Sequence, residues 1–216
     1  MIEAVLFDLD GTLIDTAPDM GGALNNLLIE EGLPTLPLES IRPFVSRGGL
    51  VLTRLGFAEY VSEDEIEPLR QRYLQHYRDI VAESSHLFDG YEQIIESLLA
   101  RQINWGIVTN KPEWLTTPLL AELQIDSPVV ICGDTLEHRK PHPLPLQVAA
   151  KQLNIQCENC IYIGDDERDI IAGNAANMKT LVAAYGYISA TENIENWQAD
   201  GIIQTPLELL KHPLLD

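Results

Sequence analysis

Short, nearly continuous apolar runs recur along the chain, and each has the length of a β-strand. Continuous rather than alternating apolar residues are typical of parallel strands that are covered by helices on both faces of a sheet. The pattern therefore predicts parallel strands at Ala4–Phe7, Trp105–Val108, Val129–Cys132, Cys160–Ile163, Thr180–Ala183 and Gly201–Ile203.

Segments with helical spacing separate the later of these runs. We predict helices at Gly90–Arg101, Glu113–Leu123, Pro145–Leu153 and Glu167–Asn177. An alternation of strand and helix from residue 85 onward is the signature of an α/β fold, here a doubly wound, Rossmann-like parallel sheet.

The first strand interrupts this rhythm, because the next convincing strand arrives only at Trp105. The stretch between them predicts helices: Pro18 suits a first helical turn, and leucines 24, 27 and 28 share one face. Further helical patterns run through Leu38–Phe57 and Glu63–Val81. We therefore predict a helical cap domain over residues 17–84, inserted into a core domain of residues 1–16 and 85–216.

Composition narrows the possible partners. The chain has 216 residues, of which 45% are hydrophobic, and a formal net charge of −19. Such a charge repels polyanions, so nucleic acid is a poor partner, whereas a small phosphate ester remains possible where a metal ion and a lysine invert the field locally. The apolar runs are far shorter than the roughly 20 residues of a membrane-spanning helix, so we expect no membrane partner.

The N-terminus and the cysteines indicate the cellular compartment of the protein. Glu3 and the early aspartates interrupt the first apolar stretch, which argues against a signal peptide and for a cytoplasmic protein. Cys157-x-x-Cys160 lacks the second pair or the histidines of a zinc site, so the three cysteines are interpreted as reduced thiols. The sequence does not reveal the oligomeric state.

Candidate chemistry begins where the first strand ends, at Asp8-Leu9-Asp10-Gly11-Thr12. Carboxylates at positions i and i+2 at the carboxyl end of a parallel strand point into the crevice where open α/β sheets bind ligands, and such a pair attracts a cation. The alternative is a strand-ending turn rich in Asp and Gly.

Three further polar clusters follow strands. Thr109-Asn110-Lys111 offers a hydroxyl and backbone N–H groups to phosphoryl oxygens, although Thr-Asn is also a common helix cap. Lys140-Pro141 offers a positive charge, although an isolated lysine is usually a solvated surface residue. Asp165-Asp166 and Asp169 form an acidic cluster, which acidic helix capping also explains. The joint occurrence of four clusters at the ends of strands of one sheet favours a shared site.

With these motifs the chain resembles the haloacid dehalogenase superfamily, whose phosphatases carry Asp-x-Asp-Gly-Thr, then Thr or Ser, Lys and an acidic Gly-Asp motif in this order. The resemblance covers nearly the whole chain and implies a Mg²⁺-dependent phosphatase that acts on a small phosphate ester through an aspartyl-phosphate. It implies that Asp8 is the nucleophile, Asp10 the general acid and base, and Lys140 the charge-neutralising partner.

The same resemblance implies the binding residues. Thr12, Thr109 and Asn110 would contact the phosphate. Mg²⁺ would be held by Asp8, the Asp10 backbone carbonyl and Asp165, with Asp166 and Asp169 in the immediate surroundings of the metal. One departure is Asn177, which stands where many relatives have glycine at the end of a helix. Asparagine is the next-best residue for a left-handed cap, so we expect the turn to survive.

The substrate is indicated only by finer resemblances. The overall pattern is similar to phosphoglycolate phosphatases, and stretches such as Arg42-Pro43-Phe44-Val45-Ser46 and Tyr185-Gly186-Tyr187-Ile188 look closer to N-acetylmuramic acid 6-phosphate phosphatases. The break at Ser46-Arg47-Gly48 is polar and flexible, and these three residues are candidates to contact the sugar or carboxylate of the substrate. Arg47 is the candidate partner for a carboxylate. The alternative is an ordinary loop with a surface arginine.

Three other functions compete with a phosphatase. A phosphomutase shares the first half of the mechanism and returns the phosphoryl group to a second hydroxyl. A phospho-aspartate receiver domain is disfavoured, because it shows adjacent acids and has no room for a helical insertion. A kinase is disfavoured because the sequence contains no Gly-x-x-x-x-Gly-Lys-Ser/Thr loop.

Overall fold

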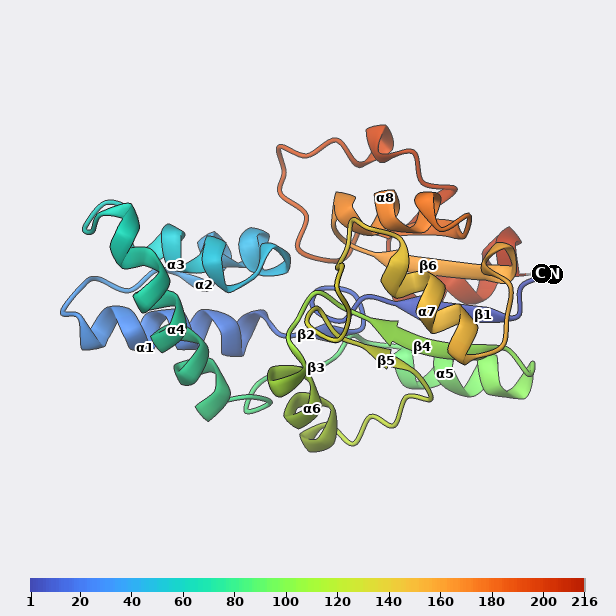
Figure 1. Ribbon diagram of the computed structural model, residues 1–216, viewed down its shortest axis with the longest axis horizontal. Coiled ribbons are helices and arrows are strands. Elements are labelled where there is room, and N and C mark those ends of the chain that lie inside the picture. The colour runs from blue at the N-terminus through green and yellow to red at the C-terminus, as the bar shows by residue number, and fades with distance from the viewer. Residues whose placement is uncertain (216) are drawn as a thin grey trace.

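A six-stranded parallel sheet forms the centre of the protein in the computed structural model, which describes residues 1–215. The strand order is β5-β4-β1-β6-β7-β8, and every neighbouring pair is parallel (Figure 1). The strands are β1 Ala4–Phe7, β4 Asn104–Val108, β5 Val130–Ile131, β6 Cys160–Gly164, β7 Lys179–Ala183 and β8 Gly201–Ile203. All six predicted strands are confirmed, with ends that differ by at most one residue.

Helices cover both faces of this sheet. Residues of β1 alternate between the faces, so that Val5 and Phe7 pack in one apolar cluster with α5, whereas Ala4 and Leu6 pack in another with α7. The helices are α5 Tyr91–Ala100, α6 Glu113–Glu122, α7 Leu144–Gln152 and α8 Glu167–Ala175. The predicted doubly wound α/β fold is confirmed. Short 3-10 helices complete the core: η2 Cys157–Asn159, η3 Ile194–Trp197, η4 Pro206–Lys211 and η5 Pro213–Leu215.

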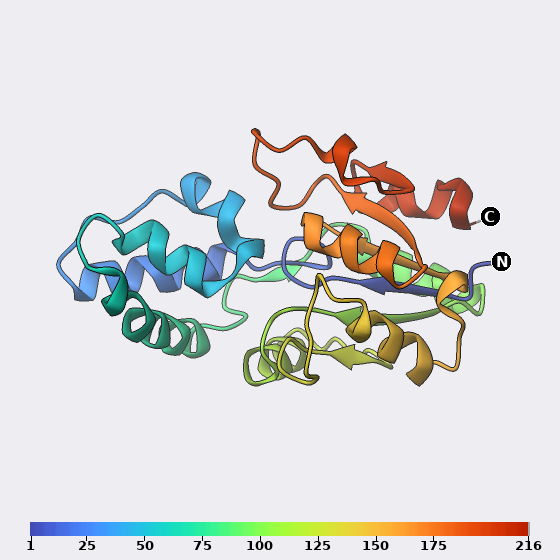
Figure 2. The same ribbon diagram turned by 45° about the horizontal axis from the view of Figure 1, so that its top comes forward.

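A group of helices lies beyond the carboxyl ends of the strands, whereas the N-terminus lies at the opposite end of the molecule (Figures 1 and 2). These helices pack around an apolar cluster of their own, which also takes in Leu115 and Tyr187 from the sheet side. They are α1 Ala17–Glu30, α2 Leu38–Ile41, η1 Arg42–Arg47, α3 Gly49–Phe57 and α4 Glu63–Asp79. The helical segments predicted between residues 17 and 84 are present, and the division into domains at these residues stays a prediction.

A two-stranded antiparallel ribbon stands where the chain leaves and rejoins the sheet. It pairs β2 Ile14–Asp15 with β3 His86–Leu87, and the sequence analysis missed it. Two residues are too few for a hydrophobic period to show. The ribbon joins the two chain segments that flank the helical group.

Asn177 adopts the left-handed conformation expected of it, with φ of 59° directly after the end of α8. The N–H of Met178 donates to the carbonyl of Gly173 over 3.0 Å, which satisfies an end carbonyl of the helix. The predicted tolerance of asparagine at this turn is confirmed.

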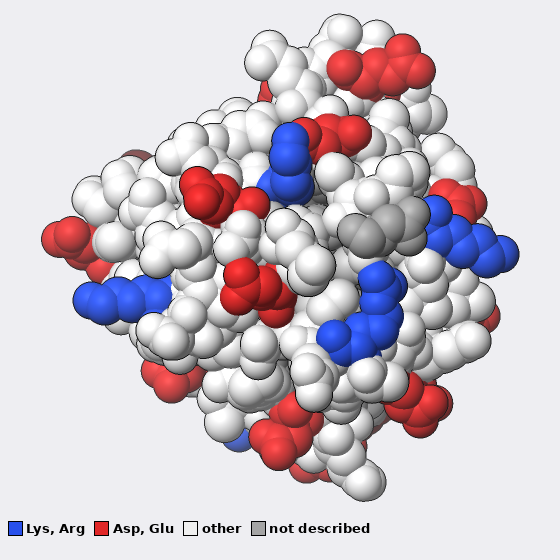
Figure 3. Space-filling model, turned by 90° about the vertical axis from the view of Figure 1, so that its right-hand side faces the viewer, with Lys and Arg blue, Asp and Glu red and all other residues white. Residues whose placement is uncertain are grey.

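Charges of both signs are interspersed on the end of the molecule that carries the N-terminus (Figure 3). The excess of acidic residues is therefore not gathered into one patch on this face. Within residues 1–215, no helix combines the length and apolar character needed to cross a membrane.

Candidate active site

The four polar clusters of the sequence meet at the carboxyl edge of the sheet. β1 lies between β4 and β6, so Asp8, Thr109 and Asp165 follow three adjacent strands. The ladder continues into the site, because the N–H of Asp8 donates to the carbonyl of Ile163 over 2.8 Å. Parallel strands end at the same edge, and this is why residues 8 and 165 become neighbours.

Lys140 reaches the site from the loop between β5 and α7. Its ammonium lies 2.7 Å from Asp8 Oδ1 and 2.7 Å from Asp169 Oδ1, and it donates to the Tyr162 hydroxyl over 2.7 Å. The Tyr162 hydroxyl donates in turn to the carbonyl of Val108. We call Asp8, Lys140, Tyr162 and Asp169 the Lys140 cluster. Its carboxylates and ammonium are almost completely buried, so their charges act through little solvent screening.

Burial and neighbouring charges shift the titration of this cluster. Burial, followed by the nearby charges of Asp169 and Asp10, raises the pKa of Asp8 to about 7, although Lys140 opposes the shift. Burial acts to lower the pKa of Lys140, but Asp169 and Asp8 outweigh it and raise the pKa. The lysine therefore stays charged beside Asp8 at neutral pH.

Asp165 carries the strongest indication of a cation. The Asp8, Asp165 and Asp169 carboxylates are buried and offer oxygens that lie within 4.8 Å of one another. Lys140 pairs with two of them, whereas the hydrogen-bond donors to Asp165 within the described chain are neutral groups: the hydroxyls of Thr12 and Ser46 and the N–H of Tyr187.

Burial, with the charges of Asp8 and Asp169, raises the pKa of Asp165 well above its ordinary value. A buried carboxylate beside other carboxylates and without a cationic partner is suited to a divalent cation. Oxygen ligands of this kind are those that Mg²⁺ prefers, so the residues present fit the metal implied by the resemblance.

A second buried lysine, Lys111, forms an ion pair with Asp10. Lys111 Nζ lies 2.9 Å from Asp10 Oδ1, and the Thr16 hydroxyl donates to the same oxygen over 2.7 Å. Lys111 Nζ also lies 3.9 Å from the sulfur of Met20 and 4.4 Å from the ring centroid of Tyr77, which gives a cation–π contact. We call Asp10, Thr16, Met20, Tyr77 and Lys111 the Lys111 cluster. Met20 lies on α1 and Tyr77 on α4, so the helical group completes this cluster.

The phosphate-binding residues predicted after β4 lie at the site. Thr109 is buried and lines the same cavity as Asp8. Asn110 donates to the carbonyl of Lys140 over 2.9 Å, which ties two motifs together. The Asn110 Oδ1 atom is buried, and no hydrogen-bond partner for it is found within residues 1–215. Thr12 faces Asp165 rather than the cavity, with its hydroxyl 3.3 Å from Asp165 Oδ1.

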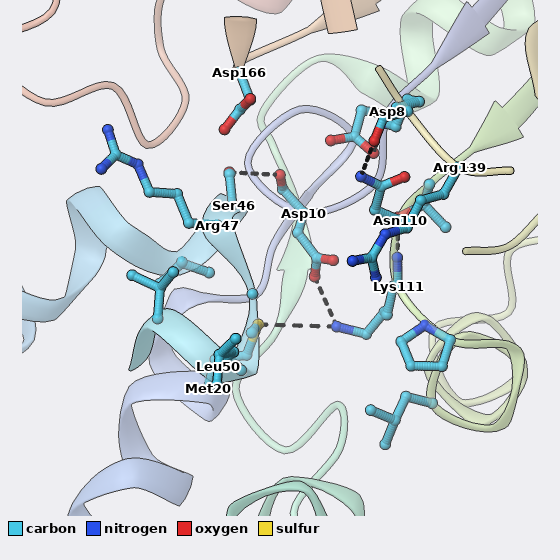
Figure 4. A pocket seen from close by; sticks show the side chains of 18 of the residues that line it. Asp8, Asp10, Met20, Ser46, Arg47, Leu50, Asn110, Lys111, Arg139 and Asp166 are labelled. Carbon is cyan, nitrogen blue, oxygen red and sulfur yellow. Dashed lines mark hydrogen bonds and ion pairs between the residues drawn. The ribbon is translucent and has the colours of Figure 1, made fainter. Parts of the chain in front are cut away.

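A cavity of about 320 Å³ lies between the sheet edge and the helical group. Asp8, Asp10, Asn110, Lys111 and Arg139 surround its floor, and Ser46, Arg47 and Leu50 approach from the other side (Figure 4). Four residues of α4 also line the cavity: Glu67, Arg70, Leu74 and Tyr77. This volume lies at the lower end of the range, about 300–1,000 Å³, that is usual for small-molecule pockets.

The three candidate residues of η1 and its end differ in what they contact. The Ser46 hydroxyl donates to Asp165 Oδ2 over 2.7 Å and lies 3.2 Å from the carbonyl oxygen of Asp10. The Arg47 guanidinium is exposed and forms an ion pair of 2.7 Å with Glu192. Gly48 has φ of 83°, a left-handed value that ends η1 and turns the chain into α3. All three line the cavity.

The two acidic residues expected near the metal stabilise the start of α8. Asp166 is its N-cap, and the carboxylate of Asp169 accepts from the N–H of Asp166 over 3.1 Å. Burial acts to raise the pKa of Asp166, but hydrogen bonds and charge from Arg168 outweigh it and lower the pKa. The same motif therefore caps the helix and contributes to the site, because Asp169 also forms an ion pair with Lys140.

The sequence analysis missed several residues of the site. Lys111, Arg139 and Arg168 stand within the sequence motifs but received no role there, and Thr16 and Tyr77 lie outside the motifs. Lys111 stands two residues beyond a predicted phosphate ligand, and this position was the one signal available. Tyr77 carries no local signal, because Lys111 comes from a distant part of the chain. Thr16 lies only six residues after Asp10, so its closeness in sequence was a signal that the motifs left unused.

Comparison with known proteins finds relatives that match nearly the whole chain. A family model described as haloacid dehalogenase-like hydrolase matches residues 5–183. A phosphoglycolate phosphatase of Xanthomonas campestris pv. campestris strain 8004 is 44% identical over 208 residues, which cover 95% of this chain and 94% of that protein. An N-acetylmuramic acid 6-phosphate phosphatase of Pseudomonas putida is 38% identical over 212 residues, which cover 97% and 95% of the two chains.

Solved structures agree with these relatives. The crystal structure of a predicted phosphoglycolate phosphatase from Haemophilus somnus 129pt matches with a TM-score of 0.86 and 25% identity, over 97% of each chain. The likeness extends over the helical group as well as the sheet, because nearly the whole of both chains is matched.

Proposed function

The chain belongs to the haloacid dehalogenase-like hydrolase family and is a phosphoric monoester hydrolase, and from this premise we propose that it is a Mg²⁺-dependent phosphatase that forms an aspartyl-phosphate on Asp8. The observation that carries the proposal is the Lys140 cluster. A buried carboxylate with an ammonium 2.7 Å away stands at the end of the cavity, where a phosphoryl group approaches.

Asp8 acts as the nucleophile in this proposal. One carboxylate oxygen attacks phosphorus, the bond from phosphorus to the ester oxygen breaks, and the alkoxide leaves with the electron pair of that bond. Lys140 holds the carboxylate in place and reduces its repulsion toward the phosphate dianion. Thr109 and Asn110 lie beside Asp8 and offer the hydroxyl and the amide that hold phosphoryl oxygens.

Asp10 acts as the general acid and base. It donates a proton to the departing alkoxide and then takes a proton from the water that hydrolyses the acyl phosphate. Lys111 and Thr16 both contact Oδ1 of Asp10, which leaves Oδ2 for the substrate and the water. These two residues therefore fix which oxygen exchanges protons.

Asp8, the Asp10 backbone carbonyl and Asp165 would hold Mg²⁺. When bound, the metal supplies positive charge that stabilises the transferring phosphoryl group. The absence of a cationic partner for buried Asp165 among the described residues supports this assignment.

The proposed substrate is N-acetylmuramic acid 6-phosphate, an intermediate of peptidoglycan recycling. The lining of the cavity includes Asp8 and, from the helical group, Leu50 and Leu74, so apolar side chains are available to a leaving group larger than that of 2-phosphoglycolate. Arginines at the cavity suit a carboxylate on the substrate. Arg47 is paired with Glu192, whereas Arg139 is exposed and has no ion-pair partner among residues 1–215, so we extend the proposed carboxylate contact to Arg139.

2-Phosphoglycolate is the second candidate. The relatives with the higher identity, 44% against 38%, carry the name phosphoglycolate phosphatase. Both candidates are phosphomonoesters with a carboxylate, so the chemistry at Asp8 is the same for both.

The test is release of inorganic phosphate from both candidates and from several sugar phosphates, with Mg²⁺ and with EDTA. We expect turnover that requires Mg²⁺, is abolished in Asp8→Asn, and has the highest kcat/KM for N-acetylmuramic acid 6-phosphate. Turnover that survives Asp8→Asn would disprove the nucleophile. A higher kcat/KM for 2-phosphoglycolate would replace the proposed substrate and leave the mechanism intact.

A further inference from the structure

The hydroxyl of Ser46 crosses from the helical group to the oxygens that would bind the metal. It lies 2.7 Å from Asp165 Oδ2 and 3.2 Å from the carbonyl oxygen of Asp10. In Figure 4 the Ser46 side chain extends from η1 toward the loop that carries Asp10. Both contacted oxygens belong to the proposed set of Mg²⁺ ligands, and η1 contributes no other side chain to them among the hydrogen bonds of the described residues.

A separate interaction fixes the backbone of Ser46. Arg168 donates from Nη2 to the carbonyl of Ser46 over 2.8 Å. The guanidinium is itself held by Asp166, with distances of 2.7 and 2.9 Å to the two carboxylate oxygens. The position of the hydroxyl therefore does not depend on its own hydrogen bonds alone.

The oxygen separations match an octahedral site. Mg²⁺ binds oxygen at about 2.0–2.1 Å in octahedral geometry, so adjacent ligand oxygens lie roughly 2.9 Å apart. The Ser46 oxygen lies 2.7 Å from Asp165 Oδ2 and 3.2 Å from the Asp10 carbonyl oxygen, two expected ligands. These distances are those expected between adjacent ligands, so the Ser46 oxygen is in a position to be a third ligand. It is too far from both oxygens to occupy the position of the ion itself, which would be about 2 Å from each.

We propose that Ser46 donates an oxygen lone pair to the bound metal, so that η1 supplies a ligand and cation binding strengthens the contact between η1 and the sheet edge. The inference rests on the proposed function, since it assumes the metal site of Asp8, Asp10 and Asp165. A hydroxyl both donates and accepts, so Ser46 binds Asp165 as a donor and turns its lone pair to the cation when one is present. Coupling of this kind is reciprocal.

The test measures metal affinity without substrate and without turnover. Mn²⁺ replaces Mg²⁺, because the same oxygen ligands suit both ions, and the EPR signal of free Mn²⁺ reports binding. We expect Ser46→Ala to weaken Mn²⁺ binding about tenfold, as loss of a supporting group at a metal site does. The matched control is Glu192→Gln, which breaks the Arg47 ion pair, a contact between η1 and the core that does not involve the proposed ligands, and is expected to leave the affinity unchanged.

Ser46→Cys tests direct ligation. A thiolate prefers Zn²⁺ to Mn²⁺, so this variant is expected to shift the preference for Zn²⁺ over Mn²⁺ by about tenfold or more relative to Ser46→Ala. The native cysteines are the same in both variants and cancel in the comparison. Circular dichroism confirms that each variant is folded.

The outcomes separate the inference from the proposed function. Equal Mn²⁺ affinity in wild type and Ser46→Ala, or no shift toward Zn²⁺ in Ser46→Cys, overturns the role of Ser46. Wild-type protein that binds no Mn²⁺, or binding that survives Asp165→Asn unchanged, overturns the metal site of the proposed function instead.

Discussion

The two aspartates of the first motif each have a buried lysine, but the two lysines are surrounded by different parts of the molecule. Lys140, beside Asp8, contacts Asp169 and Tyr162, which both belong to the sheet side. Lys111, beside Asp10, contacts Met20 and Tyr77 of the helical group. The side chains of both lysines are almost completely buried, at 2% and 4% exposure.

The difference separates two steps of the proposed reaction. The lysine that neutralises the nucleophile is held by residues of the core. The environment of the general acid and base is complete only when α1 and α4 lie over the sheet edge. Phosphoryl transfer to Asp8 and proton transfer at Asp10 should therefore respond differently to substitution.

The largest effect is expected from Lys140→Ala. Loss of the ammonium leaves Asp8 and Asp169 facing each other and the phosphate dianion, so kcat should fall about 10³-fold, as loss of a preorganised charge-stabilising group does. The fall should be similar for alkyl and aryl phosphates, because the attack by Asp8 is impaired for both. Phosphate release from the two substrate types measures this. A fall of less than tenfold would show that the metal alone neutralises the site.

A smaller and selective effect is expected from Lys111→Met. The loss of the contact to Oδ1 leaves the Asp10 carboxylate less well oriented, and general acid catalysis is worth about 10²–10⁴-fold. We expect kcat for an alkyl phosphate to fall about 10²-fold. p-Nitrophenyl phosphate has a leaving group that needs no proton, so its turnover should fall much less. Equal losses for both substrates would show that Lys111 binds the phosphate instead.

The third prediction concerns stability and pH in the absence of metal. The pKa of Asp8 is raised to about 7 and that of Asp165 is raised well above its ordinary value, so the folded state holds protons that the unfolded state releases above about pH 4. Their contribution to stability is complete below that pH and is lost as the pH rises through the folded pKa values.

In EDTA, Tm should therefore fall by a few degrees between pH 5 and pH 8 because of these groups. Mg²⁺ should raise Tm more at pH 8 than at pH 5, because the cation competes with the protons. Differential scanning calorimetry measures both shifts, and Asp165→Asn, which removes one of the two carboxylates, should reduce the pH dependence. A Mg²⁺ shift that is the same at both pH values would contradict the account.

The smallest effect is expected from Tyr77→Phe. The Tyr77 hydroxyl is buried and finds no hydrogen-bond partner in the described part of the chain, whereas the ring faces Lys111. Removing an unsatisfied polar group is nearly neutral or stabilising, so Tm should not fall and kcat should stay within about twofold of wild type. Tyr77→Leu removes the ring and should resemble Lys111→Met in its selectivity for alkyl phosphates. A large loss in Tyr77→Phe would assign the hydroxyl to the substrate.

The sequence predicted those site residues that directly follow a strand of the sheet. Asp8, Thr109 and Asp165 each follow a buried strand, and parallel strands end at one edge, so their meeting follows from the strand pattern. Lys140 does not directly follow a strand, so its place in the site was predicted only from the order of the motifs along the chain. The fold followed for the same reason: continuous apolar runs alternate with helical spacing over most of the chain.

The parts that could not be predicted depend on contacts between distant segments. Tyr77 reads as one of several apolar residues on α4, and only packing places its ring over Lys111. Arg47 reads as a free cation, whereas Glu192, 145 positions further along the chain, takes up its charge. No periodic pattern and no motif in the sequence predicts either contact.

Tyr187 ties together the two ends of the site. Its N–H donates to Asp165 Oδ2 over 2.8 Å, and its hydroxyl accepts from the N–H groups of Thr16 and Ala17, at the start of α1. The close approach needs Gly186, because a side-chain carbon there would lie 2.3 Å from Cβ of Asp165.

This arrangement has a consequence for synthesis of the protein on the ribosome. The four motif clusters, from Asp8 to Asp169, emerge before Tyr187 does. A nascent chain that ends before residue 187 would carry every proposed catalytic group, yet it would lack both the N–H that holds Asp165 and the hydroxyl that holds the first turn of α1. Completion of the site is therefore delayed to the last part of translation, and a stalled or truncated product should be inactive even where strands β1 to β7 have paired.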